Sequence, residues 1–231
     1  MVEKNQTHKT QIQGWTFRIK DPPSKTTSAP ILLLLHGHLG NEDVMWILTN
    51  SLPKGYTMLS PRAPVETGDN QFSWHKIGPQ WPEIDLYREL TEKLLIRVDQ
   101  WAKDNAPKVS RYDVMGFSQG AVLAYALAIL HPERIHRTAA IAGFIPQSWK
   151  PELTENALKD KSFFIAHGTE DNTVPVKKAQ KASKWLKEQG ADVTFCTAET
   201  GHKISADCFN GLGDFFQMDQ TSAAADQGNH T

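Results

Sequence analysis

The feature that most constrains the fold is an alternation of short apolar segments with longer amphipathic ones. Ile31–Leu35 is continuously apolar, as expected of a strand buried on both faces of a sheet. Other strand-like segments lie at 14–20, 56–60, 111–115, 138–142, 162–166 and 191–197, with helical patterns at 85–103, 119–130, 177–188 and 204–216. This alternation predicts an α/β fold, with a mostly parallel central sheet and helices on both faces.

The length of 231 residues suits one domain of this kind. We expect a single α/β domain over residues 1–217, with no part of the chain left for a separate cap domain. Residues 218–231 are polar and lack apolar periodicity, so we expect a disordered tail there.

Composition narrows the partners and the location. The formal net charge is −1 and no basic run occurs, so we expect no nucleic-acid partner. The longest apolar run is too short to span a bilayer, so we expect no stable membrane insertion. The first residues lack the apolar segment of a signal peptide, which predicts a cytoplasmic location. The two cysteines, Cys196 and Cys208, fall in a strand-like and a helix-like segment and are interpreted as reduced core thiols.

Ser118 stands in a pattern that carries chemistry. Gly116-Phe117-Ser118-Gln119-Gly120 lies between a predicted strand and a predicted helix, which is the setting of a G-x-S-x-G nucleophile elbow. Such an elbow places the serine in a strained conformation at the start of a helix. The alternative is an ordinary helix N-cap serine with two incidental glycines.

Two later loops supply an acid and a base. Glu170 and Asp171 follow the strand at 162–166, and Asp171 is the preferred acid because it opens a D-x-x-V-P pattern typical of this loop. His202 is the one histidine that both follows the acid and sits between a strand and a helix. The order Ser118, Asp171, His202 is that of the α/β hydrolases. An acidic pair in a surface turn is the alternative for Glu170 and Asp171.

A serine hydroxyl needs a base to act as a nucleophile, and the oxyanion that forms needs hydrogen-bond donors. We expect the backbone N–H groups of Gln119 and of His38, in the glycine-containing loop after Leu35, to be these donors. His36 and His38 form an H-x-H pattern that can chelate a metal, but no third ligand stands beside them. We therefore predict neither a metal nor another cofactor.

Six segments in order, ILLLLHGHLGNE, LSPRAP, FSWH, GFSQGA, HGTEDNTVP and GHKIS, resemble the phospholipase/carboxylesterase family, which includes the acyl-protein thioesterases. The resemblance spans about residues 31–216. It implies a compact α/β hydrolase acting on carboxylic esters and thioesters. Its catalytic residues fall on Ser118, Asp171 and His202, and its oxyanion donors on His38 and Gln119. Two positions depart from it, since His38 replaces a small or apolar residue and His75 replaces an aromatic one.

The segment 64–83 carries Phe72, Trp74 and Trp81 among glycine and proline residues. A loop of this length is usually functional, and we interpret the three rings as the wall of an acyl-binding site. The alternative is that the rings only pack the loop against the domain.

Together these patterns predict a carboxylesterase for short- to medium-chain esters, acting on a small-molecule ester or thioester as a monomer or homodimer. A lysophospholipase or acyl-protein thioesterase is the alternative. Such an enzyme needs a longer apolar groove, and the sequence does not give the length of the groove. A non-catalytic binding protein on the same fold is a remote alternative, because such proteins lose a member of the triad and here all three are present.

Overall fold

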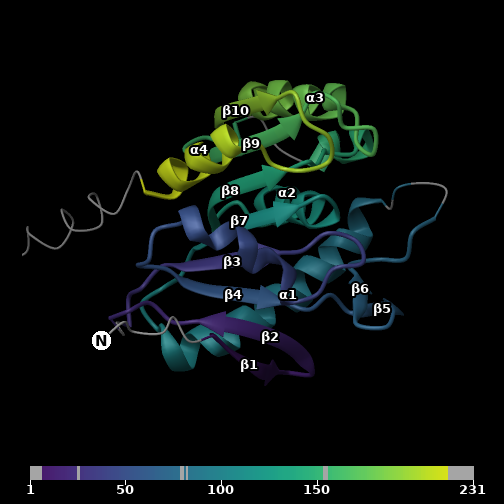
Figure 1. Ribbon diagram of the computed structural model, residues 1–231. Helices are drawn as coiled ribbons and strands as arrows, with labels where there is room; N and C mark the ends of the chain where they lie inside the picture. The colour runs from purple at the N-terminus through teal and green to yellow at the C-terminus, as the bar shows by residue number, and fades with distance from the viewer. Residues whose placement is uncertain (1–6, 25–26, 79–80, 82, 153–155, 218–231) are drawn as a thin grey trace, which may run out of the picture.

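The computed structural model describes residues 7–24, 27–78, 81, 83–152 and 156–217 (Figure 1). The predicted tail, 218–231, lies outside the described residues. The strands are β1 (Thr7–Ile12), β2 (Trp15–Lys20), β3 (Ile31–Leu35), β4 (Thr57–Pro61), β5 (Val65–Gly68), β6 (Gln71–Ser73), β7 (Tyr112–Phe117), β8 (Ile135–Ile141), β9 (Ser162–Gly168) and β10 (Asp192–Ala198). The helices are α1 (Ile84–Asn105), α2 (Gln119–Leu130), α3 (Val176–Glu188) and α4 (Ala206–Gln217), with 3-10 segments η1 (Val44–Ser51) and η2 (Gln147–Glu152).

Eight strands form one sheet in the order β1-β2-β4-β3-β7-β8-β9-β10. β1 and β2 are antiparallel to each other and β2 is antiparallel to β4, whereas every pair from β4 to β10 is parallel. This confirms the α/β hydrolase architecture expected from the sequence. The parallel strands point to the right in Figure 1, and the β5–β6 hairpin extends from that side. Loops that follow these strands therefore meet along one edge, where ligands bind in such sheets.

Both faces of the sheet are covered, as the apolar strand at the centre requires. Ile31, Leu33 and Leu35 of β3 join one buried cluster with residues of α1, α2 and α3. Leu32 and Leu34 join a second cluster with residues of η1 and α4. Because successive side chains of a strand point to opposite faces, one continuous apolar run fills both layers.

The predicted helices and strands that recur here have bounds within three residues of those expected. The sequence reading missed β1, η1, η2 and the β5–β6 hairpin. The sequence of β1, THKTQI, is mostly polar because β1 is an edge strand paired only to β2. The hairpin is short and lies in the segment that was predicted to be a loop.

None of the helices in the described part of the chain is long and apolar enough to cross a membrane.

Candidate functional site

Ser118 occupies a strained turn between β7 and α2. Its φ is 53° and its ψ is −116°, a conformation that a non-glycine residue rarely adopts. The turn is tight enough to require glycine on both sides. A Cβ on Gly116 would lie 2.1 Å from the Gly120 carbonyl oxygen, and a Cβ on Gly120 would lie 2.1 Å from the Leu35 carbonyl oxygen. The two glycines thus have a steric function, as expected of a nucleophile elbow.

His202 and Asp171 lie next to Ser118 in a hydrogen-bonded series. His202 Nε2 is 2.9 Å from Ser118 Oγ, and His202 Nδ1 is 2.7 Å from Asp171 Oδ2. The loops after β7, β9 and β10 bring the three residues together. Since a carboxylate only accepts, Nδ1 carries the proton, which leaves Nε2 of the neutral ring to accept the Ser118 proton.

The Asp171 carboxylate is held in its ionised form. The side chain is buried, and burial by itself would raise its pKa. Hydrogen bonds outweigh that effect and lower the pKa below its ordinary value. Asp171 Oδ1 accepts the N–H groups of Thr173 and Val174 at 2.8 Å each, and Oδ2 faces His202. Glu170 is exposed, and its own N–H donates to the Thr200 carbonyl.

His167 is a supporting residue that the sequence reading passed over. It is buried on β9, and its Nε2 lies 2.7 Å from the Val174 carbonyl oxygen, to which it donates. The same nitrogen is 3.3 Å from Asp171 Oδ2. His167 therefore holds the loop that presents the acid. In the sequence, the position of His167 at the end of a buried strand, four residues before Asp171, is the pattern that could have indicated this supporting role.

The loop after β3 passes beside the elbow. A Cβ on Gly37 would lie 3.3 Å from Ser118 Cβ, which places this loop directly against the serine. Among the described residues the His38 N–H has no backbone acceptor, and Gln119 is the first residue of α2, where an N–H group has no acceptor within the helix. Two amides near one serine, both free to donate, are what an oxyanion site requires.

His36 anchors this loop as a neutral residue. Burial lowers the pKa of His36 to about 4. Its Nδ1–H donates to the Gly37 carbonyl at 2.7 Å, and its Nε2 accepts the Ala63 N–H at 3.1 Å. Both ring nitrogens are therefore in use, and the H-x-H pattern cannot chelate a metal through His36 without breaking these bonds.

The aromatic residues of 64–83, interpreted from the sequence as the wall of an acyl site, have different surroundings. Trp74 is only 2% exposed, and its indole N–H donates to the His36 carbonyl at 2.7 Å. Phe72 donates its backbone N–H to the Gly40 carbonyl and lies under the Arg62 guanidinium. These contacts hold both residues in the loop packing, and a role for Phe72 or Trp74 in substrate binding stays a prediction.

Trp81 has a different surrounding. It packs against Phe144 and His75 and lines a cavity of about 340 Å³ together with Lys178 and Trp185. A role for Trp81 in substrate binding stays a prediction.

An apolar groove lies along the loop after β3. Its volume is about 620 Å³. Its lining comes from the loop after β3, from η1, from Phe117 beside the serine, and from residues just after His202: Gly37, His38, Leu39, Gly40, Val44, Met45, Ile47, Leu48, Phe117, Lys203, Ile204, Ser205, Ala206 and Phe209. Leu39, Val44 and Ile47 are among the exposed large apolar side chains, and all three lie along it. The sequence analysis does not predict this groove, because its residues come from four separate parts of the chain.

The two cysteines form a disulfide, which corrects the expectation of reduced thiols. Cys196 near the end of β10 and Cys208 in the first turn of α4 have Cα atoms 5.7 Å apart. They close a loop that contains His202, so the covalent bond ties together both ends of the segment that carries the base. Disulfides are rare in reducing compartments, and the cytoplasmic location stays a prediction.

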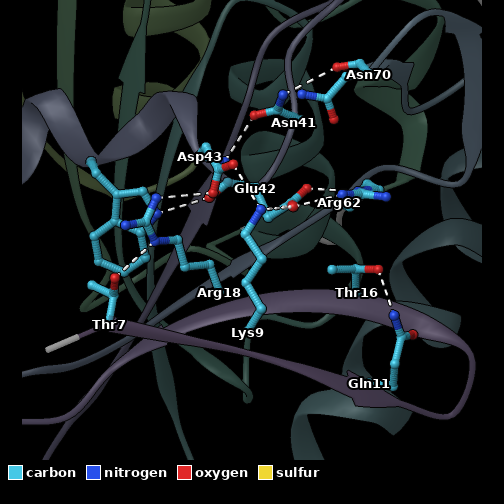
Figure 2. Close-up of polar contacts among 11 residues, drawn as sticks. Thr7, Lys9, Gln11, Thr16, Arg18, Asn41, Glu42, Asp43, Arg62 and Asn70 are labelled. Carbon is cyan, nitrogen blue, oxygen red and sulfur yellow. Dashed lines mark hydrogen bonds and ion pairs between the residues drawn. The ribbon is translucent and has the colours of Figure 1, made fainter.

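The buried carboxylate of Glu42 holds the segment that follows the loop after β3 (Figure 2). Glu42 accepts two bonds of 2.6 Å from the Arg62 guanidinium and one of 2.7 Å from Lys9 on β1. Burial alone would raise the pKa of Glu42, but the bonds from Arg62 and Lys9 dominate and lower it to about 2. Asn41 extends the network, since its side-chain amide donates to the Asn70 carbonyl at the tip of the β5–β6 hairpin.

Comparison with known proteins gives one consistent match. The phospholipase/carboxylesterase family model matches residues 17–219. The carboxylesterase SOBER1 of Arabidopsis thaliana is 33% identical over 194 residues, which are 75% of this chain and 83% of that protein. Acyl-protein thioesterase 1 of Emericella nidulans is 26% identical over 198 residues, covering 75% of this chain and 82% of that protein. The alignment with a probable SOBER1-like carboxylesterase of A. thaliana spans only 36% of that protein.

A solved structure shows the same fold. The Bacillus cereus carboxylesterase superposes with a TM-score of 0.77 at 22% identity, covering 89% of this chain and 95% of that one.

Replacing Glu42 by glutamine should remove an acid-sensitive part of the stability. Because folding lowers the pKa of Glu42 from 4.5 to about 2, the carboxylate stabilises the fold above pH 4.5, and this contribution is lost as the pH falls toward 2. At pH 7 the variant should have a lower free energy of unfolding, by about 3 kcal/mol at most, and near pH 2 the two proteins should converge. Urea unfolding at a series of pH values measures the difference, with the exposed Glu188→Gln as control. An offset that is constant with pH would contradict the assignment.

Proposed function

The chain belongs to the phospholipase/carboxylesterase family, and from this premise we propose that it is a serine carboxylesterase that hydrolyses short- to medium-chain esters through an acyl-enzyme on Ser118. The observation that carries the proposal is the series Ser118–His202–Asp171, with its contacts of 2.9 and 2.7 Å. The strained backbone at Ser118 costs folding free energy. Such strain is typical of functional sites, which supports a catalytic role for this hydrogen-bonded series.

Each residue has a defined part in the proposed reaction. His202 Nε2 takes the Ser118 proton as Oγ attacks the ester carbonyl carbon, and Asp171 stabilises the imidazolium that forms. The backbone N–H groups of His38 and Gln119 donate to the tetrahedral oxyanion. His202 then gives the proton to the leaving alkoxide, which departs as the alcohol. Water, deprotonated by His202, hydrolyses the acyl-enzyme, releasing the carboxylic acid and restoring the Ser118 hydroxyl.

The acyl chain is assigned to the apolar groove beside Phe117. The groove begins next to Ser118 and is open to solvent along Leu39, Val44 and Ile47. Each methylene that leaves water contributes about 0.8 kcal/mol to binding of the acyl chain. The value of kcat/KM should therefore rise with acyl length while the carbons still contact the groove lining. It should level off once they project into water, which favours short to medium esters over palmitoyl esters.

A lysophospholipase or acyl-protein thioesterase is the second candidate. It is favoured by the named thioesterase relative and by the exposed apolar residues that continue the groove outward. The partner in either case is a small-molecule ester or a thioester. A non-catalytic binding protein is the remote alternative, and a monomeric or dimeric state stays a prediction.

The proposal is tested at the nucleophile. Ser118→Ala should abolish hydrolysis of p-nitrophenyl acetate and butyrate, because Ser118 Oγ is the hydroxyl that His202 Nε2 contacts among the described residues. The thermal unfolding midpoint should change little. A fluorophosphonate should label the wild type at Ser118, which peptide mass spectrometry identifies. Labelling of another serine with Ser118 unmodified would overturn the assignment.

The acid is tested with two neighbouring carboxylates. Asp171→Asn should lower kcat by about 10⁴-fold, because an asparagine in this position favours the wrong histidine tautomer. Glu170→Gln, at an exposed side chain one residue away, is the matched control and should retain kcat within a few-fold. Steady-state kinetics on one ester compares them. A larger loss in Glu170→Gln would require reassignment of the acid.

The groove is tested with two exposed isoleucines. Ile47→Ala removes groove lining, whereas Ile96→Ala removes another exposed isoleucine, which belongs to α1 and does not line the groove. For the octanoyl ester, Ile47→Ala should lower kcat/KM by about 4- to 15-fold, the equivalent of one to two buried methylenes. The acetyl ester should be unaffected by either variant, since it is too short to reach Ile47. Equal losses for acetyl and octanoyl esters would exclude the groove as the acyl site, and a clear palmitoyl optimum would favour the second candidate.

A further inference from the structure

Ser73, at the end of β6, lies between the two residues that supply the proposed oxyanion donors. Its side chain is completely buried. Its Oγ is 2.5 Å from the His75 carbonyl oxygen, 3.0 Å from Gln119 Oε1 and 3.1 Å from His38 Nδ1. The first two partners are acceptors, so the single hydroxyl proton is directed toward them. The lone pairs of Oγ then face His38 Nδ1, which donates.

The orientation of the Gln119 amide is fixed independently of Ser73. Gln119 Oε1 accepts the Trp74 backbone N–H at 2.9 Å, and a backbone N–H can only donate. The oxygen of the amide therefore faces Ser73. The Gln119 side chain is also buried, so it has few other positions available.

The backbone next to His38 is strained, and the hydrogen bond from His38 to Ser73 restrains it. Leu39 has a φ of 64°, in the left-handed region that a residue with a branched side chain rarely occupies. Strained residues persist only where surrounding contacts hold them. The His38 side chain is exposed, and its bond to Ser73 connects this strained loop to the buried end of β6.

We propose that Ser73 is a positioning residue for the oxyanion site, because it links His38 and Gln119 through one buried hydroxyl. The inference rests on the proposed function. Ser73 itself does not touch the substrate. It fixes the spacing of the two backbone N–H groups, whose value depends on their being preorganised at the position of the oxyanion. Loss of the link should weaken transition-state stabilisation and leave substrate binding nearly unchanged.

The test compares two buried serines. Ser73→Ala should lower kcat by about 10- to 100-fold, less than the loss of a donor itself, with KM changed by less than about twofold. Ser60→Ala is the matched control, since Ser60 is equally buried and its hydroxyl donates only to the Leu34 carbonyl. It should retain kcat, and the two variants should have similar thermal unfolding midpoints.

A second readout separates positioning from a merely structural role. A thionoester places sulfur, a weak hydrogen-bond acceptor, where the oxyanion would form, so its hydrolysis depends little on the oxyanion site. The ratio of oxoester to thionoester kcat should therefore fall in Ser73→Ala and stay at the wild-type value in Ser60→Ala. Equal losses on both esters would overturn the proposal.

His38→Leu keeps the test decisive if Ser73→Ala does not fold, because the side chain of His38 is exposed. It should show the same kcat-selective loss, and the double variant should lose no more than either single one. An unchanged kcat in His38→Leu would overturn the proposal. A wild type that neither hydrolyses esters nor reacts with a fluorophosphonate at Ser118 would overturn both proposals, whereas normal labelling and turnover with an unaffected Ser73→Ala would overturn this one alone.

Discussion

The site depends on the close approach of α2 to the ends of β3 and β7. Gly120 in the first turn of α2 lies against the Leu35 carbonyl, and Gly116 lies against Gly120. No side chain fits in either place, and the helix begins at Gln119, one residue after Ser118. The same approach brings the loop after β3 beside the serine. One steric constraint thus positions the nucleophile and both proposed oxyanion donors.

Two buried ionisable groups next to that loop are accommodated in opposite ways. His36 is buried without an ionic partner, and burial keeps it neutral, so it can both donate to Gly37 and accept from Ala63. Glu42 is buried with two cationic partners and stays ionised. Both solutions satisfy the polar atoms completely, which is the condition under which a buried polar group holds a loop in one conformation.

Local signals in the sequence identified the sheet, the helices and the loops that carry Ser118, Asp171 and His202. Each of these depends on neighbours in the chain: the continuous apolar run, the two glycines, the order of the strand ends. The features that sequence reading missed depend on residues distant in the chain. An aromatic residue such as Trp74, in a loop rich in glycine and proline, is typical of a pocket wall. Only its burial and its hydrogen bond to the His36 carbonyl show that it packs in the core. Likewise, nothing in the spacing of Cys196 and Cys208 indicates that β10 and α4 bring them within bonding distance.

The groove proposed for the acyl chain and the loop proposed to carry an oxyanion donor share residues, so the two proposals together predict a link between specificity and rate. His38 and Leu39 both line the groove, the backbone N–H of His38 is the proposed oxyanion donor, and the backbone of Leu39 is strained. A substrate that displaces the Leu39 side chain therefore acts on the backbone that positions a donor. The loop after β3 is held by the bond from the Phe72 N–H of the hairpin to the Gly40 carbonyl and by the bond from Arg62 to Glu42. The rest of the loop can therefore absorb little of the displacement at Leu39. Acyl chains that fit without moving Leu39 should then be the ones for which binding and transition-state stabilisation are both retained, and discrimination against bulky or branched acyl groups should be expressed in kcat as well as in KM.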